Sequence, residues 1–171
     1  DRGSKDGVRE NMPVVTGKGL VGHVTEVGPV SSKVQLILDA RSSVGTIVQR
    51  PESRVTGILT GTMDNPYMPQ MVDIPRNADV EDGDAVVTSG FGGIYPKGIA
   101  VGHVAAQHSD DSGLLKVAVI ETAVNFQRLE DVAIITASRE APPTPIQPTP
   151  LSPGAEAAAQ ISAAQTKAAA Q

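Results

Sequence analysis

The sequence has no cysteine and no tryptophan, and it has only two tyrosines and two phenylalanines among 171 residues. Without cysteine, disulfides, thiolate catalysis and cysteine-based zinc sites are excluded. So few aromatic side chains argue against stacking platforms for single-stranded nucleic acid or sugars. Fourteen basic residues against 19 acidic ones give a net charge of −5, which excludes a generally basic nucleic-acid binder. No apolar run approaches the roughly 18 residues that a membrane span requires.

The composition changes towards the end of the chain. Prolines gather between Pro142 and Pro153, and the segment Ala155–Gln171 is rich in alanine. We therefore predict a disordered or marginally helical Pro/Ala-rich tail over residues 139–171. Because the chain begins at Asp1 rather than methionine, we expect a processed or trimmed piece of a longer protein.

The preceding residues are rich in valine and contain most of the 17 glycines, a composition typical of short strands joined by tight turns. We expect an all-β fold, with strands that include Val44–Val48, Arg54–Thr60 and Asp131–Thr136. About 140 residues are enough for one medium domain or two small ones.

An internal repeat favours two small domains. Val14-Val15-Thr16 matches Val86-Val87-Thr88, and Val21-Gly22-His23-Val24 matches Val101-Gly102-His103-Val104. Two weaker matches keep the same order: Asp6-Gly7 with Asp82-Gly83, and Lys33–Asp39 with Lys116–Glu121. About five or six short strands per copy predict a small closed barrel, with each central glycine at a bulge or bend. The boundary is expected in the proline-rich segment Asn65–Pro75, which gives a first barrel at 1–72 and a second at 73–138.

The candidate reactive residues favour structural roles. His23 and His103 hold equivalent places in the repeat. Each could be a metal ligand or a base, but a half-buried strand histidine bonded to backbone is the favoured interpretation. The run His108–Gly113 resembles a metal cluster but fits a polar hairpin turn better. Ser89-Gly90 lacks the Gly-Asp that precedes a chymotrypsin-like nucleophile, and no Gly-x-Ser-x-Gly elbow occurs. We therefore predict no catalytic, cofactor-binding or metal-binding residues.

The glycine-rich loop carries half of all the aromatic residues, Phe91 and Tyr95. It lacks the Gly-Lys-Thr/Ser of a phosphate-binding loop, so a flexible connection is the better interpretation. The two rings could plug the mouth of a barrel or anchor a partner. The predicted partner-binding patch comprises Phe91, Ile94 and Tyr95, with Tyr67 and Met68 as a second candidate.

The same loop lies in the strongest resemblance to a known family. Residues 88–102 read TSGFGGIYPKGIAVG and resemble the signature TSGLGGxFPxGLxVG of the rod shape-determining protein MreC family. Phe91 and Tyr95 depart from it, since leucine and phenylalanine are usual there. Further similar segments, in order over about residues 1–136, are Gly3–Val8, Met12–Val15, Gly19–Val27, Gly57–Gly61 and Lys116–Val132.

This resemblance implies two tandem six-stranded β-barrels, arranged as in chymotrypsin but without catalytic residues. It also implies a non-catalytic scaffold of the bacterial cell-elongation machinery, which maintains rod shape by binding and organising peptidoglycan-synthesis enzymes. The expected partners are MreD, RodA, a class B penicillin-binding protein and the MreB system, together with self-association as a dimer or filament. The location would be the extracytoplasmic, periplasmic face of the cytoplasmic membrane, with an N-terminal membrane anchor and a coiled coil in the longer protein. A periplasmic adaptor subunit of an export pump is the alternative, and an enzyme comes third.

Overall fold

The computed structural model describes residues 2–50, 54–110 and 112–136. The tail predicted for residues 139–171 lies outside this described part. Ten strands occur there: β1 (Pro13–Val15), β2 (Leu20–Val27), β3 (Ser32–Leu36), β4 (Val44–Val48), β5 (Thr56–Thr60), β6 (Gln70–Pro75), β7 (Ala85–Thr88), β8 (Ala100–Ser109), β9 (Leu115–Thr122) and β10 (Ala133–Ile134). Two short 3-10 helices, η1 (Ser4–Asp6) and η2 (Phe126–Arg128), complete the elements.

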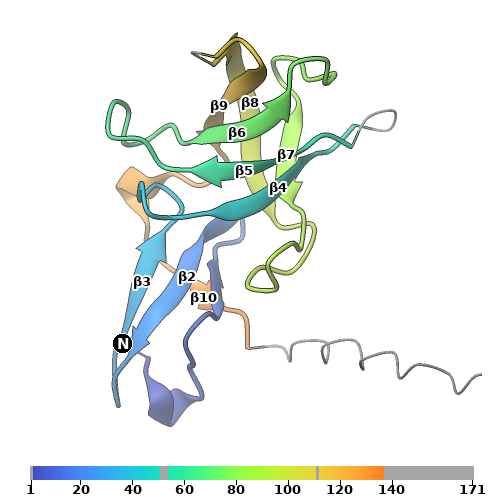
Figure 1. Ribbon diagram of the computed structural model, residues 1–171. Coiled ribbons are helices and arrows are strands. Elements are labelled where there is room, and N and C mark those ends of the chain that lie inside the picture. Colours follow the sequence, from blue (N-terminus) through green and yellow to red (C-terminus); the bar gives the residue numbers. More distant parts are fainter. Residues whose placement is uncertain (1, 51–53, 111, 137–171) are drawn as a thin grey trace, which may run out of the picture. The chain divides into compact units, whose positions relative to one another are not determined.

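The strands form one closed barrel and one smaller sheet (Figure 1). The barrel has the order β4-β5-β6-β9-β8-β7, and the other sheet, called here the N-terminal sheet, has the order β10-β1-β2-β3. The all-β prediction is confirmed, and one six-stranded barrel is present. The N-terminal sheet has four strands rather than the expected six, because the residues that flank β1 and β10 fold as η1, η2 and loops.

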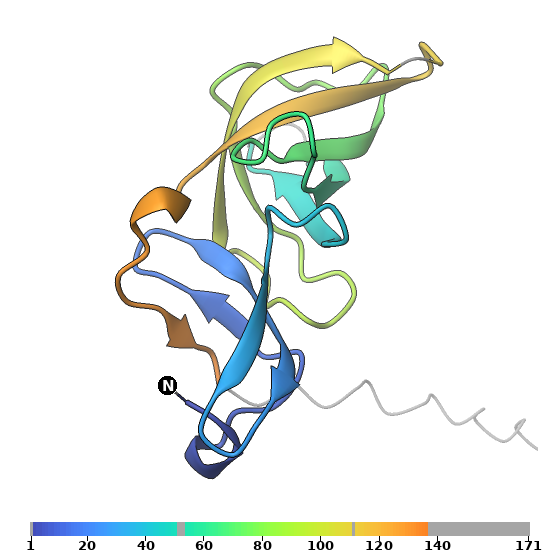
Figure 2. The ribbon, with the colours of Figure 1, turned by 90° about the vertical axis from the view of Figure 1, so that its left-hand side faces the viewer.

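The predicted boundary between residues 72 and 73 is wrong, because it falls inside β6, a strand of the barrel. The barrel takes every strand from β4 to β9, and the N-terminal sheet takes β1 to β3 and then β10. The barrel is therefore inserted between β3 and β10. Figure 2 shows β3 and β10 along the two margins of the N-terminal sheet, with β1 and β2 between them.

The repeat is confirmed as two copies of one three-stranded unit, β1-β2-β3 and β7-β8-β9. In the first copy Val14 lies opposite Gly22 and Val24 opposite Val34, with register shifts after Val14 and after Val24. In the second copy Val86 lies opposite Gly102 and Val104 opposite Ile120, with register shifts at the same two places. The two copies thus share strand pairing as well as sequence.

The central glycines of the repeat are required by the approach of the third strand. A Cβ atom at Gly22 would overlap the backbone carbonyl of Gln35, and one at Gly102 would overlap that of Glu121. Backbone atoms cannot move aside cheaply in a paired strand, so only glycine fits both positions. The bulges that the sequence placed at these glycines lie beside them instead.

The structure aligns the two weaker repeat matches differently from the sequence. His23 pairs with Gln35 and His103 pairs with Glu121, so the third strands correspond with a shift of three residues from the Lys33–Lys116 match. The residue equivalent to Gly83 is Asn11 rather than Gly7. Asn11 and Gly83 both have positive φ, and both donate from N–H to the equivalent strand carbonyl, on Val24 or Val104.

Two hydrophobic cores lie under these sheets. The core of the N-terminal sheet contains Val14, Val21 and Val24, and it is covered by Val8 and Val124 from the flanking loops. The barrel core consists of inward-facing residues of β4 to β9, and it also receives Leu20 and Ile37 from the end of the N-terminal sheet. These two fully buried side chains join the sheet to the barrel by direct packing.

Candidate docking surface

The glycine-rich loop between β7 and β8 is tethered to the barrel at both ends. The hydroxyl of Thr88 donates to the carbonyl of Pro96 and accepts from the N–H of Ile99. The N–H of Ser89 donates to the carbonyl of Gly45 on β4 at 2.9 Å. The loop contains four glycines with positive φ, a conformation that other residues adopt at a cost: Gly90, Gly92, Gly93 and Gly98. The connection that the sequence predicted is thus hydrogen-bonded to the barrel at both of its ends.

Phe91 is the exposed apolar residue of this loop. The residue is 83% exposed, while its backbone N–H donates to the Ser89 hydroxyl at 3.2 Å. A large aromatic ring on a tethered backbone loses little conformational freedom when a partner covers it. Phe91 is therefore the candidate for a docking anchor in this loop.

Tyr95 and Ile94 have a different role from Phe91. Tyr95 is only 4% exposed and belongs to the barrel core, and Ile94 is half-buried against the same core. Of the two interpretations of the aromatic pair, the plug describes Tyr95, and only Phe91 is exposed enough to be considered as an anchor. Tyr95 cannot contact a partner directly in this conformation, which corrects its place in the predicted patch.

Tyr95 also connects the loop to the N-terminal sheet. Its hydroxyl lies 2.8 Å from Nδ1 of His23 on β2, and the two rings meet edge to face. Burial lowers the pKa of His23 and raises the pKa of Tyr95 to about 12. The expectation that both histidines bond to backbone is wrong, because His23 binds a side chain and His103 is exposed to solvent. Sequence reasoning missed the pairing because 72 residues separate its members.

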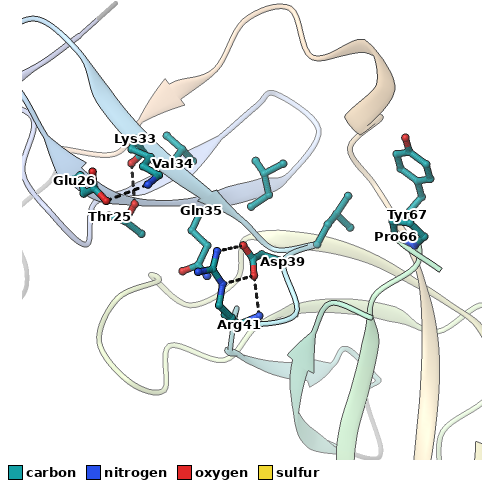
Figure 3. Close-up of a pocket in the computed structure, with 11 residues that line it drawn as sticks. Thr25, Glu26, Lys33, Val34, Gln35, Asp39, Arg41, Pro66 and Tyr67 are labelled. Carbon is teal, nitrogen blue, oxygen red and sulfur yellow. Dashed lines mark hydrogen bonds and ion pairs between the residues drawn. The ribbon is translucent and has the colours of Figure 1, made fainter. Parts of the chain in front are cut away.

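The second predicted patch lies on the loop between β5 and β6. Tyr67 is 53% exposed, and with Pro66 it lines a shallow cavity of about 530 Å³ beside β3 (Figure 3). Met68 is half-buried and does not line the cavity. The structure therefore places Tyr67 on the β5–β6 loop, beside β3, and Phe91 on the separate β7–β8 loop.

The charges around this cavity are matched in pairs. Arg41 donates from Nε and Nη2 to the carboxylate of Asp39, and these bonds hold the pKa of Asp39 far below its usual range. Lys33 lies 3.1 Å from Glu26 in an exposed ion pair. Val34, Leu36 and Leu38 supply the apolar lining. A surface with paired charges and an apolar floor is suited to a neutral, largely apolar protein segment rather than to a charged ligand.

The other candidate residues hold structural positions. Asp110 accepts from the Ser112 hydroxyl and from the N–H of Leu115, which confirms the polar hairpin turn between β8 and β9. Within the described ranges, no group of three or more His, Asp and Glu side chains could hold a metal ion. No helix among the described residues is long and apolar enough to cross a membrane.

Fold and surface together define an all-β module, in which a closed barrel presents an exposed aromatic ring on a tethered loop. The chain belongs to the MreC family, because the family model described as "Rod shape-determining protein MreC, barrel core" matches residues 1–136. Among curated proteins, the chain is 34% identical to the cell shape-determining protein MreC of Listeria monocytogenes over 82% of this chain and 48% of that protein. It is 35% identical to that of Escherichia coli over 79% of this chain and 36% of that protein. The chain thus spans about half or less of these relatives.

Solved structures agree with this assignment. MreC from Listeria monocytogenes has a TM-score of 0.73 at 33% identity and covers 78% of this chain and 64% of its own. MreC from Pseudomonas aeruginosa has a TM-score of 0.63 at 33% identity and covers 71% of this chain and 78% of its own. A complex between Penicillin-Binding Protein (PBP2) and MreC from Helicobacter pylori matches with a TM-score of 0.61 at 24% identity. The match covers 74% of this chain and 79% of that chain, and it shows a shared fold.

Proposed function

We propose that this chain is the docking head of a non-catalytic scaffold that organises peptidoglycan-synthesis enzymes during bacterial cell elongation and so maintains rod shape. Membership of the MreC family and the cell shape role named for its relatives support this function. The observation that carries the docking role is the ring of Phe91, which is 83% exposed on a loop held by hydrogen bonds on both sides.

A class B penicillin-binding protein is the first partner to test, since MreC from Helicobacter pylori is seen in complex with a Penicillin-Binding Protein (PBP2). The wider proposal includes MreD, RodA, the MreB system and self-association as a dimer or filament. It also places the domain on the periplasmic face of the cytoplasmic membrane, held by an N-terminal anchor of the longer protein. In this proposal the N-terminal sheet, with its own core, acts as the second barrel of a tandem pair.

The proposed mechanism is differential binding by a rigid surface. A scaffold activates a synthase only if it binds the active conformation more tightly than the inactive one. Phe91 and Ile94 form the primary surface, and Tyr67 and Met68 form the second. Tyr95 supports the primary surface from within the same loop, because its side chain is buried in the barrel core.

The first test compares Phe91→Ser with Leu114→Ser in binding to a purified penicillin-binding protein ectodomain. Leu114 is 73% exposed on the β8–β9 hairpin, so it controls for the loss of any exposed apolar residue. Truncating a central anchor typically costs more than about 2 kcal/mol, so we expect at least a tenfold weaker affinity for Phe91→Ser. The Leu114 variant should bind like the wild type.

Thermal unfolding of both variants checks that each is folded. Equal affinity of Phe91→Ser and wild type would remove the loop from the docking surface. A selective loss in Tyr67→Ser would then assign the role to the cavity beside β3.

A further inference from the structure

Strand β3 forms a free edge of the N-terminal sheet. The order β10-β1-β2-β3 gives it a single neighbour, β2. The opposite edge, β10, has only two residues, whereas β3 has five. An edge strand presents unpaired N–H and C=O groups, with which another extended chain can pair. β3 is therefore the longer of the two places at which this sheet can be extended.

The pairing of β2 with β3 shows which backbone groups point to the free edge. Val24 lies opposite Val34, but its own N–H and C=O bond to the chain that leads into β1. The two residues are therefore a non-hydrogen-bonded pair, and the N–H and C=O of Val34 point away from β2. Ile37 donates from N–H to the carbonyl of Val21, which places the N–H of Leu36 on the same free edge. Within the described residues, none of these three groups has a partner.

The cavity of about 530 Å³ beside β3 follows this edge. It is lined by four consecutive residues of the strand, from Lys33 to Leu36. Successive side chains of a strand point to opposite faces, so a cavity that contacts all four lies along the edge rather than over one face. Pro66 and Tyr67 line the far side (Figure 3). A strand added to β3 lies about 4.8 Å from it, which places the added strand in this cavity.

The lining of the cavity favours an uncharged strand. Its charged side chains are paired with one another, Lys33 with Glu26 and Arg41 with Asp39. A charged side chain that entered the cavity would separate one of these pairs or lie unpaired against the apolar lining, which includes Tyr67. Residues two apart in a strand face the same side, so apolar residues at alternate positions of the added strand contact this lining.

A second copy of the chain fits this edge less well than a separate segment. Each copy carries the loop between β5 and β6 at this edge, with Tyr67 across the cavity from β3. Two β3 edges that paired would therefore displace both loops, whereas a single strand occupies only the cavity. The net charge of −5 also opposes association between copies. These features favour a strand supplied by another protein.

We propose that β3 is a strand-addition site, which binds an uncharged, extended segment of a partner protein as a fifth strand of the N-terminal sheet. The partner backbone bonds to Val34 and to the N–H of Leu36, and its apolar side chains lie in the cavity beside Tyr67. This binding mode rests on the proposed docking function, since it is the way in which the second surface holds a partner. It does not involve Phe91.

The test is amide hydrogen exchange, followed by NMR, of the 171-residue chain with a model peptide. The capped peptide Ac-SVTLSVT-NH2, at about 1 mM, is neutral and has apolar residues at alternate positions. We expect it to slow exchange at the N–H of Val34 and of Leu36 by about fivefold or more. The N–H of Gln35 faces β2 and is the internal reference, with an expected change below about twofold.

A second peptide separates strand addition from occupation of the cavity alone. In Ac-SVPPSVT-NH2, adjacent prolines remove one donor from each edge of the peptide strand. This peptide should protect neither Val34 nor Leu36.

Two variants separate the edge from the cavity wall. Val34→Pro removes an N–H that points away from β2, so the bonds to β2 are kept while the free edge is blocked. Tyr67→Ser removes the far wall at an exposed position, so it remains informative if Val34→Pro does not fold. Val30→Ser is the control, because Val30 is 63% exposed in the turn before β3 and does not line the cavity. Protection of Leu36 should be lost in the first two variants and kept in the third.

Three results would overturn the proposal: no slowing at Val34 and Leu36, equal protection by both peptides, or protection unchanged in Tyr67→Ser. Protection that rises with chain concentration in the absence of peptide would show that a second copy occupies the edge, which also contradicts it. The experiment uses no penicillin-binding protein. Its failure therefore leaves the docking role of Phe91 to its own test, and failure of that test leaves the result at β3 unchanged.

Discussion

At the scale of single residues, environment decides what a repeated side chain does. His23 and His103 have the same neighbours in the sequence and the same strand register, yet one is half-buried against Tyr95 and the other faces solvent. The difference comes from the loop between β7 and β8, whose Tyr95 lies against the first histidine, whereas the second is exposed. A sequence motif alone could therefore not assign the two residues different roles.

The His23–Tyr95 pair should show measurable coupling in stability. A hydrogen bond between partly buried neutral groups contributes about 0.5–1.5 kcal/mol to the free energy of unfolding. We expect a double-mutant cycle of His23→Gln and Tyr95→Phe, measured by urea unfolding at neutral pH, to give a coupling energy in that range. Additive effects of the two substitutions would show that the contact contributes nothing to folding.

The lowered pKa of His23 also predicts how stability changes with pH. Because the pKa in the folded state lies below the ordinary value of 6.5, the unfolded chain binds the proton more readily. The contribution of this group is therefore fully present above pH 6.5, and it is lost as the pH falls through the folded-state pKa. Urea unfolding at several pH values should show a smaller acid loss in His23→Gln than in His103→Gln. The reverse order would contradict this assignment.

At the scale of elements, the sequence predicted regular strands better than irregular ones. Val44–Val48 agrees residue for residue with β4, and Arg54–Thr60 contains β5. β6 was missed because its alternation is interrupted. Met71 and Ile74 are both buried, three residues apart, and between them Asp73 has positive φ at a register shift in the pairing with β9. A bulge of this kind removes the period of two on which strand prediction depends.

The shared geometry of the two repeat units predicts equal sensitivity at their central glycines. Gly22→Ala and Gly102→Ala each place a methyl group against the backbone of a paired strand. Overpacking of this type costs about 1–3 kcal/mol or more, so both variants should unfold at clearly lower temperature. Gly17→Ala is the control, because a Cβ there meets no atom within 4 Å. Wild-type stability in either repeat variant would show that the third strand can move.

The candidate site was predictable only as a region. The sequence placed Phe91 and Tyr95 together because both lie in one glycine-rich loop. It could not separate them, since the path of that loop is set by positive-φ glycines and by tethers to Thr88 and Gly45. That path turns one ring into the core and leaves the other in solvent.

At the scale of the whole molecule, two fully buried side chains contribute to the coupling between the sheet and the barrel. Leu20 and Ile37 come from the N-terminal sheet, but both are fully buried in the core of the barrel. Shared burial of this kind couples the unfolding of neighbouring structures.

The variant Ile37→Ala should therefore weaken the coupling as well as the stability. We expect a loss of about 2–5 kcal/mol together with a broader or two-step denaturant transition, because the N-terminal sheet can then unfold separately. Leu59→Ala, which removes a fully buried side chain of β5 within the barrel, should lower stability with the transition still in one step. A single sharp transition in both variants would show that the two parts are coupled by other contacts.

The return of β10 to pair with β1 has a consequence for synthesis on the ribosome. Residues 133–134 are translated after the whole barrel. Val14 and Val15 therefore cannot pair with β10 until nearly all of the fold has emerged. The later-made barrel can close first, while the earliest strands remain incomplete. For this chain the order of completion therefore runs against the order of translation.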